Sequence, residues 1–171
     1  MLKQAIYLFL ISSAFGLGIN LVSPNKIDVV GDYRELLTGE GPIVPPSAQE
    51  GDPPFIDISV AQMEFTAKTS LFVDARDTAE FNCGTIPGSI HIPFDYLPEG
   101  DLGVHFDSTL AQVSKERLMI VFCSGEECDL SLHLARNLQQ EGYTGVSIFF
   151  GGAREWAKVG LTLEKRAECV E

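Results

Sequence analysis

The stretch LMIVFCSGEECDLS, residues 118–131, joins an apolar run to a short cysteine-bearing loop and then to the start of a helix. The run LMIVF has the length and apolar character of a buried strand, and apolar residues at every fourth position then favour an amphipathic helix over 129–143. This order places Cys123 at the carboxyl end of a strand, where open α/β sheets bind ligands. Loop N–H groups and a helix N-terminus can lower the pKa of a thiol there. Cys123 is therefore a candidate nucleophile, and a buried structural cysteine is the alternative.

Short strands and helices alternate through the rest of the chain after Phe55. Further strands are expected at LFVDA (71–75), SIHI (89–92) and VSIFF (146–150). Helices are expected over 60–68, capped by Ser59, within the polar connection 94–117 and over 154–160. This alternation predicts a parallel sheet covered by helices on both faces.

The N-terminal part has a different composition. Residues 5–22 form an 18-residue apolar run behind Lys3, which predicts one transmembrane helix or a cleaved signal segment over 1–22. Residues 23–55 are rich in proline and glycine and are typical of a linker. The predicted organisation is thus an anchor or signal segment (1–22), a linker (23–55), one α/β domain (56–165) and a polar tail (166–171). The domain is expected outside the cytoplasm, with the bacterial periplasm favoured, either membrane-anchored or as an exported soluble form.

Composition excludes one class of partner. The 171 residues carry 24 acidic and 12 basic side chains, a net charge of −12, which argues against nucleic-acid binding because that binding depends on cationic side chains. Two neighbouring thiols without a histidine cluster fall short of a tetrahedral metal site, so no metal and no organic cofactor are expected.

Four segments, in order, resemble the rhodanese family between Ile58 and Glu164. They are LFVDARDTAEF (71–81), FNCGTIPGSIHIPF (81–94), VFCSGEEC (121–128) and GYTGVSIFFGGAREWAKVGLTLE (142–164). The resemblance implies a five-stranded parallel sheet flanked by helices on both faces, here preceded by one N-terminal transmembrane helix. It also implies that Cys123 takes sulfur from a donor as a persulfide and passes it to a nucleophilic acceptor.

The loop departs from the family pattern in its last residues. Cys128 stands where the family usually has Arg or Lys, and Glu126 and Glu127 precede it; elsewhere Thr85 replaces the usual His. Acidic neighbours raise a thiol's pKa and repel anions, which argues against thiosulfate as the natural donor. A second cysteine followed by Asp-Leu-Ser resembles a subgroup of membrane-anchored bacterial rhodanese-like proteins.

The candidate site contains Cys123 as the catalytic residue, with substrate-binding contributions from the loop and from one distant arginine. The backbone of Ser124, Gly125, Glu126, Glu127 and Cys128 is expected to cradle the persulfide. Arg76, of the Asp-x-Arg signature, either meets an anionic donor or forms a structural ion pair with Asp74. Cys128 is either a resolving thiol for Cys123 or a passive neighbour.

Three functions follow. The first is a sulfurtransferase that moves sulfane sulfur through a Cys123 persulfide from a small sulfur-containing donor to a thiol or other nucleophilic acceptor. The second is thiol-disulfide or redox activity of the Cys123 and Cys128 pair. The third is a non-catalytic module that binds a membrane-protein partner.

Overall fold

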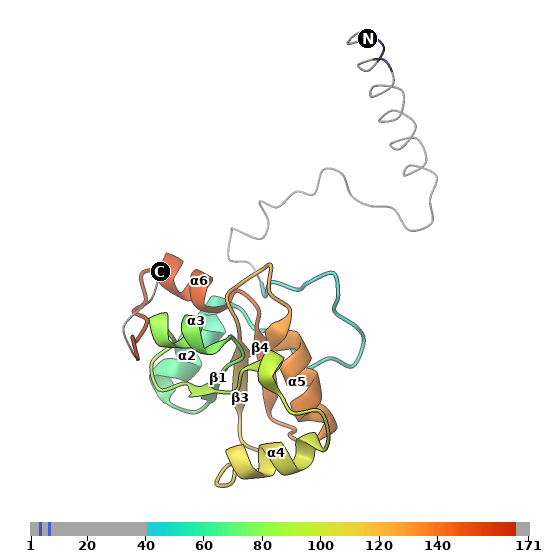
Figure 1. Ribbon diagram of the computed structural model, residues 1–171. Helices are drawn as coiled ribbons and strands as arrows, with labels where there is room; N and C mark the ends of the chain where they lie inside the picture. The colour runs from blue at the N-terminus through green and yellow to red at the C-terminus, as the bar shows by residue number, and fades with distance from the viewer. Residues whose placement is uncertain (1–3, 5–6, 8–40, 167–171) are drawn as a thin grey trace. The chain divides into compact units, whose positions relative to one another are not determined.

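A computed structural model describes residues 4, 7 and 41–166 of the chain (Figure 1). The central sheet has four parallel strands in the order β2-β1-β3-β4. They are β1 (Leu71–Asp74), β2 (Ile90–His91), β3 (Met119–Phe122) and β4 (Val146–Phe149). All four lie at positions that the apolar runs predict.

Helices connect the strands and cover both faces of the sheet (Figure 1). They are α2 (Ile58–Ala67), α3 (Thr78–Cys83), α4 (Leu102–Thr109), α5 (Leu130–Gln140) and α6 (Gly152–Lys158), with a short 3-10 helix at Phe94–Tyr96. The first of these helices is capped by Asp57, whose carboxylate accepts a hydrogen bond from the Val60 N–H, and not by Ser59 as predicted. Asp57 is the better cap because its backbone is extended where the helix begins.

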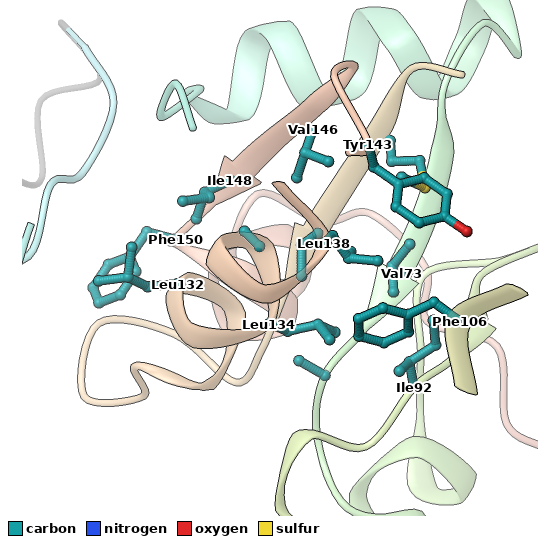
Figure 2. Close-up of a cluster of buried hydrophobic side chains, with 14 of the residues drawn as sticks. Val73, Ile92, Phe106, Leu132, Leu134, Leu138, Tyr143, Val146, Ile148 and Phe150 are labelled. Carbon is teal, nitrogen blue, oxygen red and sulfur yellow. The ribbon is translucent and has the colours of Figure 1, made fainter. Parts of the chain in front are cut away.

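Successive side chains along each strand point to opposite faces of the sheet, and this divides the core into two layers. Phe72, Ile120, Phe122 and Phe149 point to the face covered by α2 and α6, where Trp156 is buried. The alternate residues of the same strands point to the opposite face, where they meet α5 and α4. Figure 2 shows Leu132, Leu134 and Leu138 of α5 packed among the residues of this second layer. The leucines spaced four residues apart in the sequence therefore predicted the buried face of α5 correctly.

The prediction of a five-stranded sheet is wrong, because the sheet has four strands. At the outer edge of β4, Phe55 makes a single parallel bridge to Ile148. Ile56 N–H donates to the Ile148 carbonyl and Ile148 N–H donates to the Pro54 carbonyl. Pro53 and Pro54 have no N–H groups to donate, so the pairing cannot extend into another strand.

The predicted transmembrane helix at residues 5–22 lies outside the described residues, apart from Tyr7. In the described part of the chain, no helix is long and apolar enough to cross a membrane. The described fold is therefore an α/β domain with four strands, without the predicted membrane-spanning element.

Residues 41–55, at the C-terminal end of the predicted linker, pack on the domain. Ile43 is buried in the core layer beside α5. Arg136 of α5 forms a two-pronged ion pair with Asp52, with N···O distances of 2.6 and 2.8 Å, and donates to the Ser47 carbonyl. The segment thus runs along α5 toward the loop that precedes it.

Candidate active site

The loop between β3 and α5 carries both free thiols of the described residues, those of Cys123 and Cys128. Cys123 follows β3 directly, and the loop turns through a hydrogen bond from the Cys128 N–H to the Gly125 carbonyl. The start of α6 holds the other side of the loop. There, the N–H groups of Ala153 and Arg154 donate to the carbonyls of Cys123 and Ser124 at 2.9 and 3.0 Å. The loop is therefore fixed to the sheet at its base and to α6 along its length.

The sulfur of Cys123 is held as a buried thiol. The residue is 0% exposed, and its S–H donates to the carbonyl of Cys128, with Sγ 2.6 Å from the oxygen. Ser131 donates its hydroxyl to the same sulfur at 3.4 Å. Burial raises the pKa of the Cys123 thiol strongly, and the hydrogen bonds from Ser131 only partly oppose this effect. The sequence-based expectation that loop amides activate Cys123 is thus not met in this conformation.

Cys128 has the opposite environment. Its side chain is half-buried, and the neighbouring Cys123 side chain lowers the pKa of Cys128 to about 6. Backbone N–H groups of Ser124 and Leu130 also donate to its sulfur and lower the pKa further, while burial and the charge of Glu80 oppose them. In this loop the thiolate is therefore favoured on Cys128.

The backbone N–H groups that were predicted to surround the Cys123 persulfide are not directed at the Cys123 sulfur in this conformation. The Ser124 N–H lowers the pKa of Cys128, and the Cys128 N–H is occupied by the Gly125 carbonyl. The sulfur of Cys123 is instead within hydrogen-bond distance of a carbonyl oxygen and the Ser131 hydroxyl. N–H donors stabilise a thiolate and a carbonyl stabilises a thiol, so the two sulfurs are prepared for different roles.

Arg76 is buried and paired with neighbouring groups of the domain. The guanidinium is 5% exposed, and it binds both carboxylate oxygens of Asp74 at 2.9 and 2.6 Å. It also donates to the Gly84 carbonyl at 2.7 Å, and Thr85 donates its hydroxyl to the same Asp74 carboxylate. This geometry favours the structural ion pair over direct contact with an anionic donor.

Acidic side chains line the approach to the two thiols. Glu80 accepts a hydrogen bond from the Ser124 hydroxyl at 2.6 Å and lies 3.8 Å from Arg76. Glu126 and Glu127 are exposed in the loop itself. Glu155 of α6 lies nearby; burial raises its pKa, and the charge of Glu126 raises it further. The only exposed cation paired with this rim among the described residues is Arg154, 3.7 Å from Glu127.

Several residues of the site were not identified from the sequence. Ser131, Glu80 and Glu155 contact or face the loop from three different helices. Ser47, in the predicted linker, donates its hydroxyl to Asp129, the residue after Cys128, at 2.8 Å. Ser131 belongs to the Asp-Leu-Ser run that follows Cys128, and this run is the only sequence signal that pointed toward any of them.

The two thiol environments predict a pH profile for alkylation. Iodoacetamide reacts with thiolates, so the rate at Cys128 is expected to rise with pH, to reach half its maximum near the pKa of about 6 and to level off above it. Replacing Cys123 with alanine removes the largest cause of the low pKa and is expected to move the midpoint upward. Cys123→Ser keeps a hydroxyl donor and is the matched control. A midpoint of about 8.5, the ordinary value for cysteine, that does not move in Cys123→Ala would contradict this assignment.

This arrangement is an α/β domain with a cysteine-bearing loop at the carboxyl end of a parallel sheet, where α6 holds the backbone of the loop. Residues 59–159 match the Rhodanese-like domain family, so the chain belongs to that family. A search of curated proteins found no match.

Solved structures share the fold. The BH2092 protein from Bacillus halodurans is 23% identical, with a TM-score of 0.56 over 70% of this chain and 85% of its own. The human single-domain sulfurtransferase TSTD1 is 23% identical, with a TM-score of 0.51 over 63% of this chain and 97% of its own. EanB in complex with hercynine is 16% identical, with a TM-score of 0.58 over 69% of this chain and 29% of its own.

Proposed function

We propose that the protein is a sulfurtransferase that carries sulfane sulfur as a Cys123 persulfide and passes it to a thiol acceptor. The observation that supports this most directly is the pair of free thiols in one loop of a rhodanese-like domain, at the carboxyl end of its sheet. The similar fold of the human single-domain sulfurtransferase is consistent with this chemistry. The reaction needs no cofactor, because sulfur passes between thiolates by ordinary exchange.

The acidic side chains around the loop, called the acidic rim below, give the site a preference for the charge of its donor. Glu80, Glu126, Glu127 and Glu155 lie around the loop and outnumber the exposed Arg154, while Arg76 is held by Asp74, so an anionic donor meets net repulsion. Thiosulfate, a dianion, is therefore a poor fit. A neutral or cationic persulfide is favoured.

Two persulfides of equal length test this preference. Cysteamine persulfide, which carries an ammonium group, is expected to load sulfur on the protein about tenfold faster at low salt than 3-mercaptopropionate persulfide, which carries a carboxylate. The readout is the gain of one sulfur atom in the intact mass over time. The ratio is expected to fall in added salt and in the double variant Glu126→Gln, Glu127→Gln. Equal rates for the two donors would rule out selection by the rim.

A redox function of the pair is the second candidate. The two thiols are close enough that each shifts the pKa of the other, so an oxidant that removes two hydrogens would join them in a disulfide. In the loading experiment this outcome is a loss of two hydrogens without a gain of sulfur. No mass change with any donor would instead favour the binding module.

We propose in addition that the domain works outside the cytoplasm. Cys83 is disulfide-bonded, and disulfides persist in oxidising compartments. Peptide mapping of the untreated protein under non-reducing conditions tests this bond, because the peptide that carries Cys83 should be joined to a second peptide and released on reduction. A protein purified without exogenous oxidant that shows no such bond would count against export.

A further inference from the structure

The loop presents its two sulfurs in a fixed order to an incoming donor. Cys128 is half-buried and lies behind the exposed Glu126 and Glu127, whereas Cys123 has no exposed surface. The Cys123 sulfur is covered by the Cys128 carbonyl at 2.6 Å and by Ser131 at 3.4 Å. A donor that approaches from solvent in this conformation therefore reaches Cys128 first.

The hydrogen bonds around the two sulfurs also favour Cys128 as the first to react. Backbone N–H groups favour the thiolate at both sulfurs, those of Ser124 and Leu130 at Cys128 and that of Ser131 at Cys123. Only Cys123 has its S–H directed at a carbonyl oxygen, that of Cys128, and so remains a thiol. This contact, which does not depend on the identity of the donor, distinguishes the two cysteines.

We propose that sulfur enters the site at Cys128 and passes inward to Cys123, so that Cys128 is a catalytic residue and the first nucleophile. This inference rests on the proposed sulfurtransferase function and extends it to the path of the sulfur. It differs from a resolving role, in which Cys128 acts only after Cys123 has reacted.

Both steps balance as thiol exchange. In the first, the Cys128 thiolate attacks the outer sulfur of a persulfide R–S–SH; the new S–S bond forms on Cys128, the old one breaks, and R–S⁻ leaves with the electron pair. In the second, Cys123 attacks the outer sulfur of the Cys128 persulfide, and its proton passes to the Cys128 sulfur as that sulfur leaves. The products are a Cys123 persulfide and a free Cys128, with no net oxidation.

The environments favour this direction of transfer. A thiol of low pKa is the faster leaving group in exchange, so Cys128 is suited to give the sulfur up once it holds it. Attack on the inner sulfur instead would give a Cys123 to Cys128 disulfide and hydrosulfide, which is the redox outcome.

Variants of the full chain that each lack one of the two loop cysteines test the order of the two steps, with cysteamine persulfide as the donor. After a timed reaction, free thiols and persulfides are trapped by alkylation and the protein is cut after glutamate. Cleavage after Glu127 places Cys123 and Cys128 on separate peptides. Thermal melting of each variant confirms that it is folded.

The expected results separate the alternatives. Cys123→Ser should gain sulfur on Cys128 at close to the wild-type rate, whereas Cys128→Ser should load Cys123 about tenfold more slowly or less. The wild-type protein should carry its sulfur on Cys123 at the end of the reaction. Rapid loading of Cys123 in Cys128→Ser, with none on Cys128 in Cys123→Ser, would overturn the order while leaving sulfur transfer intact. If the wild-type protein gains no sulfur, the proposed function itself fails.

Discussion

Replacing Arg76 with alanine is expected to lower the free energy of unfolding by about 3 to 5 kcal/mol. The guanidinium binds both oxygens of the fully buried Asp74 and the carbonyl of Gly84, so its removal leaves a buried carboxylate and a buried carbonyl without their main partner. The Thr85 hydroxyl and the backbone N–H of residue 76 still donate to Asp74 but cannot neutralise its charge. Urea unfolding followed by circular dichroism measures the change.

Arg154→Ala is the matched control for this substitution. Arg154 is also an arginine next to the loop, but its side chain is 69% exposed and lies 3.7 Å from an exposed glutamate. An exposed pair of this kind contributes at most about 1 kcal/mol. An Arg76→Ala protein of unchanged stability with impaired donor use would instead restore the donor-binding role for Arg76.

The positions of β1, β3 and β4 were predictable because these strands are largely buried on both faces of the sheet and so appear in the sequence as short, mostly apolar runs. LFVDA, LMIVF and VSIFF contain β1, β3 and β4, and the spacing of leucines indicated α5. The number of strands was less accessible, because it depended on whether a further segment pairs at the edge. The prolines before Phe55 limit that segment to one bridge.

The candidate site was predictable only where its members are close in sequence. Cys123, the loop and Cys128 lie within six residues, so their proximity followed from the strand-loop-helix order. Which sulfur receives the backbone N–H groups depends on dihedral angles within the loop, and residue types do not determine those angles. The two alternatives for Arg76 could likewise be separated only when Gly84 and Thr85, from another loop, were found around it.

Replacing Gly152 with alanine is expected to cost about 3 to 4 kcal/mol and to abolish sulfur loading, because the glycine touches the backbone of the loop. Gly152 has φ +60°, and a Cβ atom there would lie 2.2 Å from the Cys123 carbonyl oxygen and 3.0 Å from the Gly125 nitrogen. Both neighbours are backbone atoms that cannot rotate away. The same carbonyl accepts the hydrogen bond from Ala153 that fixes the loop to α6, so relief of the clash must move Cys123.

Gly160→Ala separates backbone strain from this clash. Gly160 also has a positive φ, +85°, but nothing lies within 4 Å of the Cβ position, so its substitution should cost only about 1 to 2 kcal/mol and leave loading unchanged. Urea unfolding and the rate of sulfur gain from cysteamine persulfide are measured for both variants. If Gly152→Ala loaded sulfur at the wild-type rate, contact between α6 and the Cys123 carbonyl would not be needed to position the loop. Loss of loading in Gly152→Ala alone would show that the glycine is required because of the carbonyl it faces and not because of its positive φ.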